Sequence, residues 1–193
     1  MATYMGRRWS RRELLSWVGS VEQLAGARRS RLEEGKADGV EAVDVTTGGG
    51  LRFTVLPGRG MDIAAAAYRD VPLSFLSGTG ITSAAYYEEP SLGFLRGFYG
   101  GLLTTCGIAN AGAPSVDGGE PFGLHGRVAN AAAEDVAVTQ SWEGDEYRIA
   151  VRGTMREAKA MFENLRLTRT VSTRLGRAGL TIRDTIENVG FEP

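Results

Sequence analysis

The sequence has almost none of the residues that build disulfides and metal centres. It contains one cysteine, Cys106, and one histidine, His125, among 193 residues. A single cysteine cannot form an internal disulfide, and one cysteine with one histidine cannot complete the usual four-ligand zinc site. We therefore expect a reducing, cytoplasmic setting and no structural metal.

The chain also lacks an excess of charge of one sign and any long apolar run. Lys and Arg number 22 against 23 Asp and Glu, a formal net charge of −1. Such a balance gives no field that would attract nucleic acid. Because no run of about 18 apolar residues occurs, we expect no membrane span. The segment 10–15 looks like a twin-arginine export signal, but Ser16, Ser20 and Glu22 interrupt the apolar stretch that must follow one.

The length predicts one domain with one sizeable core. Near its start, Ser10 followed three residues later by Glu13 is a capping-box pattern, which predicts a short helix. Gly19 is the residue at which we expect this helix to end.

After the helix, apolar residues recur with a period of two, which is typical of strands with one buried face. Turns at Pro57-Gly58 and at 176–179 predict two hairpins. The stretch 74–134 is rich in Gly, Pro, Ser and Asn and predicts long connecting loops, where binding residues often concentrate. We expect strands at 51–55, 61–68, 147–151, 165–171 and 179–188.

The end of the sequence shapes the domain prediction. The last predicted strand runs into Val189-Gly190-Phe191-Glu192-Pro193 with no element to cover its edge. Natural domains usually protect such an edge. We therefore expect residues 1–193 to be the N-terminal portion of a single domain that is incomplete at its C-terminus.

Two loop segments carry candidate site residues. His125 lies between two glycines in Phe122-Gly123-Leu124-His125-Gly126-Arg127, where the backbone can approach a ligand closely. A histidine there is suited to protonating an oxygen, or it simply bonds the backbone of a tight turn. Arg59 and Asp62 flank a glycine at the entry to a strand; they would bind sugar hydroxyls, or form an ion pair that fixes the turn.

Cys106 is a third candidate. A cysteine hydrolase would need a thiolate activated by a histidine such as His125. A free cysteine is more often a small buried apolar residue, which is the interpretation we favour. The acidic loop residues Glu88, Glu89, Asp117 and Glu120 are expected to be solvated.

Taken together, these segments resemble the galactose mutarotase superfamily, and within it bacterial aldose 1-epimerase-like proteins that mostly lack an assigned substrate. The resemblance covers nearly the whole chain, and its His-Gly and Arg-Gly-Met-Asp pieces are the distinctive ones. The segments that carry it are 7–9 with the capped helix, 21–26, 56–63, 100–107, 122–127 and 187–193.

The resemblance implies an all-β antiparallel β-sandwich, often called a supersandwich, with a sugar lying across a concave sheet face. It places His125 near the sugar ring oxygen, and we expect Arg59, Asp62 and Arg127 to hold hydroxyls. A second histidine and a catalytic glutamate are implied beyond Pro193. Gly126-Arg127 stands where better-known mutarotases carry two glycines, so the substrate need not be glucose or galactose.

The expected activity is interconversion of sugar anomers by general acid–base ring opening, which requires no cofactor. Because the base lies outside this sequence, we expect residues 1–193 alone to be nearly inactive and only marginally folded. The expected partner is a monosaccharide or a sugar derivative. A non-catalytic sugar-binding protein remains an alternative, and a cysteine-dependent hydrolase is a more remote one.

Overall fold

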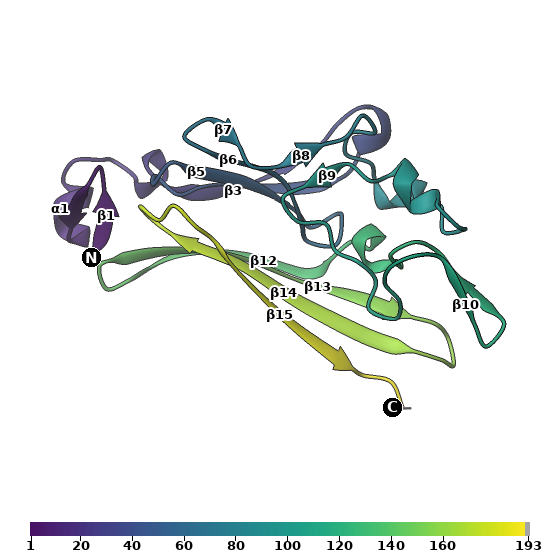
Figure 1. Cartoon of the computed structure of the whole chain (residues 1–193). Helices are drawn as coiled ribbons and strands as arrows, with labels where there is room; N and C mark the ends of the chain where they lie inside the picture. The colour runs from purple at the N-terminus through teal and green to yellow at the C-terminus, as the bar shows by residue number, and fades with distance from the viewer. Residues whose placement is uncertain (192–193) are drawn as a thin grey trace.

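Two antiparallel sheets form the body of the protein and lie one above the other in Figure 1. The structure is a computed structural model that describes residues 1–191; Glu192 and Pro193, the last two residues of the C-terminal motif, lie outside the described residues. The upper sheet has the order β3 (Gly26–Arg31), β4 (Glu41–Thr46), β5 (Leu51–Leu56), β6 (Asp62–Tyr68), β7 (Val71–Pro72).

The lower sheet has the order β12 (Glu134–Glu143), β13 (Glu146–Ala158), β14 (Asn164–Arg174), β15 (Thr181–Asn188). Every neighbouring pair in both sheets is antiparallel. The predicted antiparallel β-sandwich is therefore confirmed, as are the hairpins β5–β6 and β14–β15.

The core lies between the two sheets because the strands alternate as the sequence predicts. On β5, Phe53 and Val55 are buried while Arg52 faces outward. On β13, Ile149 and Val151 are buried while the neighbouring arginines are exposed. Burying each such side chain stabilises the fold by roughly 1.5–3 kcal/mol relative to leaving it exposed.

The N-terminus forms a small ribbon, β1 (Ala2–Tyr4) with β2 (Arg7–Trp9), followed by α1 (Arg11–Leu15). The capping box is confirmed, with the Ser10 and Glu13 side chains each bonded to the other's backbone amide. The predicted end at Gly19 is wrong. The helix stops at Leu15, where the Ser16 hydroxyl donates to the Glu13 carbonyl at 2.6 Å.

Residues 74–134 are mostly loop, as predicted, but they contain short paired segments. Two ribbons form there: β8 (Phe75–Leu76) with β9 (Gly100–Gly101), and β10 (Ser115–Asp117) with β11 (Glu120–Phe122). The single-turn 3-10 helices of the chain are η1 (Val21–Gln23), η2 (Gly35–Ala37), η3 (Ala84–Tyr86), η4 (Gly93–Arg96) and η5 (Val128–Asn130).

β15 is the outermost strand of the lower sheet (Figure 1). Within residues 1–191 its outer edge pairs with no strand. Ile182 and Ile186 are register partners of the buried Val171 and Leu167, so they point to the core side of the sheet. They remain 38% and 60% exposed, because no layer of the described chain covers them.

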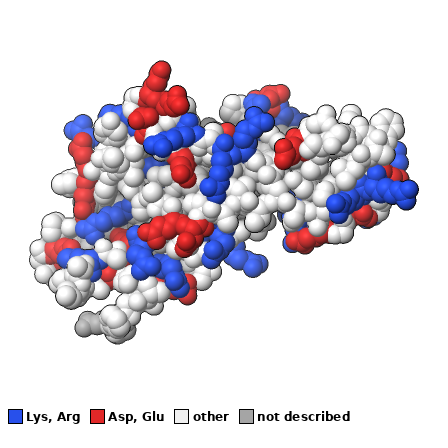
Figure 2. Space-filling model, turned by 180° about the vertical axis from the view of Figure 1, so that it is seen from behind, with Lys and Arg blue, Asp and Glu red and all other residues white. Residues whose placement is uncertain are grey.

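Three further features bear on function. Basic and acidic side chains are interspersed over the face shown in Figure 2, in keeping with the balanced composition. No helix among the described residues is long and apolar enough to cross a membrane. In the same part of the chain, no three His, Cys, Asp or Glu side chains are grouped so as to hold a metal ion.

Candidate functional site

His125 occupies a tight turn between β11 and η5. Its φ is 59°, in the left-handed region, where histidine is found more often than most non-glycine residues. Two backbone hydrogen bonds hold it there: its amide donates to the Gly112 carbonyl at 2.9 Å, and its carbonyl accepts from the Gly107 amide. A non-glycine residue held in this way often marks a functional position.

The imidazole ring of His125 is partly buried, with one side packed on an aromatic neighbour. The Phe94 ring meets it edge-on, with centroids 5.3 Å apart and planes at 73°. Within residues 1–191, neither ring nitrogen has a hydrogen-bond partner. The ring is therefore held in place by packing and keeps both nitrogens available for a ligand.

Arg127 lies two residues further on, with acidic and phenolic side chains around it. Its guanidinium donates to Glu89 and lies 3.9 Å from a carboxylate oxygen of Glu163. The hydrogen bond to Glu89 raises the pKa of Arg127, so this cation stays charged. Tyr87 donates its hydroxyl to the Gly126 carbonyl at 3.1 Å. Together these side chains give the His125 turn a rim of hydrogen-bond donors and acceptors.

Arg59 is 1% exposed and points into the protein. Its guanidinium donates to the backbone carbonyls of Ala129 (3.0 Å), Thr82 and Gly97 (3.4 Å). It also lies over the Tyr99 ring, 5.3 Å from the centroid. Burial lowers the pKa of Arg59, although an arginine stays protonated in proteins. The side chain ties three loop segments together, one of them directly after the His125 turn.

Asp62 is also fully buried. Its carboxylate accepts from the Thr105 amide (2.7 Å), the Thr105 hydroxyl (2.6 Å) and the Tyr99 hydroxyl (3.1 Å). Arg169 lies 4.0 Å away. Burial raises the pKa of Asp62 to about 6, against the opposing effect of the hydrogen bonds from Thr105 and Tyr99.

Of the four predicted site residues, His125 and Arg127 lie two positions apart on one turn, and both are partly exposed. Arg59 and Asp62 lie beneath them, with their polar atoms already bonded to protein. Their predicted role as hydroxyl ligands stays a prediction, and the geometry shows each holding a loop next to the His125 turn.

Sequence reasoning missed the role of some acidic side chains of this region. Glu89 was expected to be solvated, but it is partly buried and pairs with Arg127; Glu120 is likewise partly buried and pairs with Lys159. Glu88 and Asp117 are exposed as expected, and Glu88 forms a surface ion pair with Arg96. Glu157 was not considered, although it is 4% exposed and bonded to the amides of residues 108 and 109. Its position in the sequence could have indicated a special role. Glu157 continues the inward-facing, odd-numbered residues of β13, where a carboxylate is unexpected.

The expectation that Cys106 is buried is wrong. The residue is exposed, because the loop that starts at Thr105 turns this side chain outward while Thr105 itself bonds the buried Asp62. No hydrogen bond or ion pair of the thiol occurs in the part of the chain described, so the geometry contains no base that would activate it.

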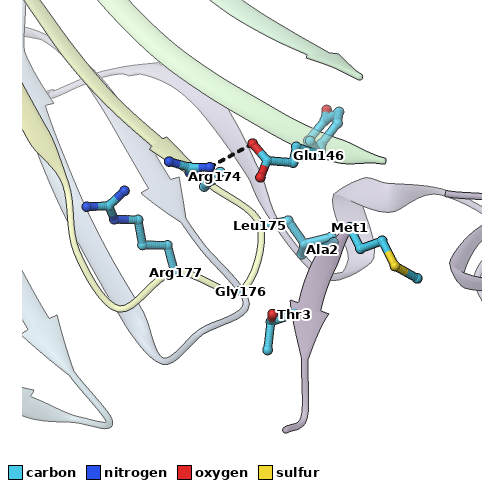
Figure 3. Close-up of a pocket in the computed structure, with 9 residues that line it drawn as sticks. Met1, Ala2, Thr3, Glu146, Arg174, Leu175, Gly176 and Arg177 are labelled. Atoms are coloured by element: carbon cyan, nitrogen blue, oxygen red, sulfur yellow. Dashed lines mark hydrogen bonds and ion pairs between the residues drawn. The ribbon is translucent and has the colours of Figure 1, made fainter. Parts of the chain in front are cut away.

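A separate hollow of about 240 Å³ lies at the other end of the molecule, between β1 and the turn after β14 (Figure 3). Arg174 bonds Glu146 across it at 2.7 Å, and the Arg177 side chain extends beside Arg174. A ligand bound there would not touch His125 or Arg127.

The fold is similar to two solved structures. One is a Klebsiella pneumoniae protein provisionally described as an aldose 1-epimerase: the TM-score is 0.78 with 22% identity, over 88% of this chain and 46% of that chain. The other is the galactose 1-epimerase of Lactobacillus acidophilus: the TM-score is 0.43 with 16% identity, over 77% of this chain and 44% of that one. The chain thus spans less than half the length of either protein. The second likeness is too weak to carry an argument.

No curated protein matches the sequence. The model of a family described as a domain of unknown function (DUF4432) matches residues 37–193, which is most of the chain. The first structural likeness shows a galactose mutarotase-like fold. On this evidence the protein belongs to the DUF4432 family and has the galactose mutarotase-like fold.

Proposed function

We propose that this chain binds a free aldose in its cyclic hemiacetal form at the His125 turn, as part of an aldose 1-epimerase-like protein. The observation that carries the proposal is the state of His125: a left-handed backbone fixed by two hydrogen bonds, and an imidazole with no hydrogen-bond partner within residues 1–191. The galactose mutarotase-like fold supports a sugar as the ligand.

In the proposed complex, an imidazole nitrogen of His125 faces the ring oxygen of the sugar. Anomer exchange needs an acid that protonates this oxygen while a base takes the proton of the anomeric hydroxyl, so that the ring opens and recloses on either face. A positioned imidazole is a common proton donor in such chemistry. Each such group contributes roughly 10²–10⁴-fold in rate.

Arg127, Glu89 and Glu163 are proposed to bind the sugar hydroxyls. An arginine offers only donors and a carboxylate only acceptors, whereas a hydroxyl can serve as either. The mutual pairing of these side chains keeps them oriented in the absence of a ligand. In this proposal Arg59 and Asp62 do not contact the sugar; they hold the loops next to the His125 turn in place.

Calorimetric titration with a panel of free hexoses and pentoses tests the proposal. We expect saturable binding of at least one sugar, and its loss in His125→Asn. Asparagine tolerates the left-handed backbone, so this variant removes the imidazole while keeping the turn. Arg177→Ala, in the distant hollow of Figure 3, is the matched control and should bind as wild type does. Equal binding by wild type and His125→Asn would refute the site.

Polarimetry on freshly dissolved sugar separates catalysis from binding alone. We propose that residues 1–193 bind without accelerating anomer exchange, because His125 supplies only the acid half of the reaction. Rapid anomerisation by this chain, abolished in His125→Asn, would instead mean that these residues already contain the base.

A further inference from the structure

Glu157 has an unusual environment for a carboxylate. It lies near the end of β13, faces the interior and is 4% exposed. Its Oε2 atom accepts from the amides of Ile108 (2.7 Å) and Ala109 (3.2 Å). Its Oε1 atom is buried with no hydrogen-bond partner. A half-satisfied buried carboxylate is costly, so its presence calls for an explanation.

The loop that Glu157 holds is the one that fixes His125. Asp62 anchors the start of this loop through the Thr105 amide, and Glu157 anchors its middle. Gly107 lies between the two anchors, and its amide donates to the His125 carbonyl. Each anchor is a buried carboxylate that accepts from backbone amides, so the loop is clamped from two sides.

The backbone of this loop lies so close to the His125 turn that the two have little room to move independently. A Cβ atom on Gly107 would lie 2.6 Å from the Asn110 carbonyl oxygen and 2.7 Å from the Gly126 Cα atom. The backbones are therefore in van der Waals contact, and a shift of the loop must move the turn as well.

We propose that Glu157 is a positioning residue: by holding the amides of Ile108 and Ala109 it fixes Gly107, and through Gly107 it sets the orientation of the His125 imidazole. Glu157 fixes the His125 ring in this way whether or not a sugar is bound. Only the expected effect on sugar binding rests on the proposed function.

A rival explanation assigns the effect of Glu157 to its charge, which favours the cationic form of the nearby Arg127. Two conservative variants separate these explanations. Glu157→Gln keeps an acceptor oxygen at the same reach but removes the charge. Glu157→Asp keeps the charge but is shorter by one methylene, so its oxygen falls short of the two amides.

The test uses the ring resonances of His125, which NMR assigns without ambiguity because the chain has one histidine. In sugar-free protein, we expect Glu157→Gln to retain the wild-type ring shifts and Glu157→Asp to shift or broaden them. Met155→Ala, at a fully buried position on the same face of β13, is the control for lost stability and should keep the wild-type shifts. Unchanged shifts in Glu157→Asp, or equal changes in both Glu157 variants, would overturn the proposal.

Sugar titrations of the same variants then separate the two claims. If wild type binds sugar, Glu157→Asp should weaken binding on the order of tenfold or more, since small misplacements of a site residue are costly, while Glu157→Gln should stay close to wild type. If the two Glu157 variants change the His125 ring signals as predicted but wild type binds no sugar, the proposed function is overturned and the positioning role stands. If wild type binds sugar but the His125 ring signals of Glu157→Asp are unchanged, the positioning role is overturned and the proposed function stands.

Discussion

The burial of Arg59 gives the sharpest prediction about stability. Arg59→Met keeps much of the side-chain volume but removes the donors to the carbonyls of Ala129, Thr82 and Gly97. Each buried carbonyl left without a partner costs roughly 1–3 kcal/mol. Part of this cost is offset because the variant no longer buries a charge. With three carbonyls affected and this offset, we expect the free energy of unfolding to fall by about 3–5 kcal/mol.

Urea unfolding followed by the fluorescence of the three tryptophans measures this loss. Since small domains are stable by only about 5–15 kcal/mol, Arg59→Met could leave much of the protein unfolded. Arg59→Lys is the second variant: its ammonium can reach fewer carbonyls, so an intermediate loss is expected. A change below about 1 kcal/mol in Arg59→Met would refute the structural role. A large loss of sugar affinity with unchanged stability would restore Arg59 as a ligand residue.

Three further predictions follow from individual positions. Asp62 holds its proton more tightly in the folded state, with a pKa of about 6, so the stability difference between wild type and Asp62→Asn should change by up to about 3 kcal/mol between roughly pH 4 and pH 6. The wild type becomes less stable relative to the variant as pH rises through this window, and parallel urea midpoints would contradict the pKa. Gly107→Ala should weaken sugar binding because its Cβ meets the Asn110 carbonyl at 2.6 Å, whereas Gly78→Ala, with open space around it, should not; calorimetry compares the two. Alkylating the exposed Cys106 should leave sugar affinity unchanged, and a stoichiometric loss of a hydrolytic activity would favour the hydrolase alternative instead.

Local periodicity made much of the fold predictable. β5 and β14 alternate apolar and polar residues, and β6 is a short apolar run; turn residues separate the two strands of each hairpin, so neighbouring strands could be paired from the sequence. The capping box located the start of α1 for the same reason, since it depends on residues only three positions apart. The helix end was predicted less well, because Ser16 ends it through a side-chain bond that also occurs within longer helices.

The site was harder to predict because its contacts join distant segments. Arg59 bonds carbonyls at positions 82, 97 and 129, and no local pattern foretells such partners. Glu157 reaches amides 48 and 49 residues away. Read locally, Arg59 and Asp62 fit both a ligand site and an ion pair that fixes the turn, and the sequence alone did not indicate the loop contacts that each of them makes in the fold. For His125, the flanking glycines indicated a special backbone, and the φ of 59° agrees with this; its role at a site stays a prediction.

The most direct test of the proposed function is a titration of the His125 ring resonances with a free aldose and, in parallel, with the matching sugar alcohol. The alcohol keeps the other hydroxyls but cannot form the hemiacetal ring, so the oxygen that the imidazole is proposed to face is a free hydroxyl on an open chain and not a ring oxygen. We predict a saturable shift of the His125 signals with the aldose and none with the alcohol. Equal shifts with both compounds, or no shift with any aldose of the panel, would contradict the assignment of this turn as a sugar site.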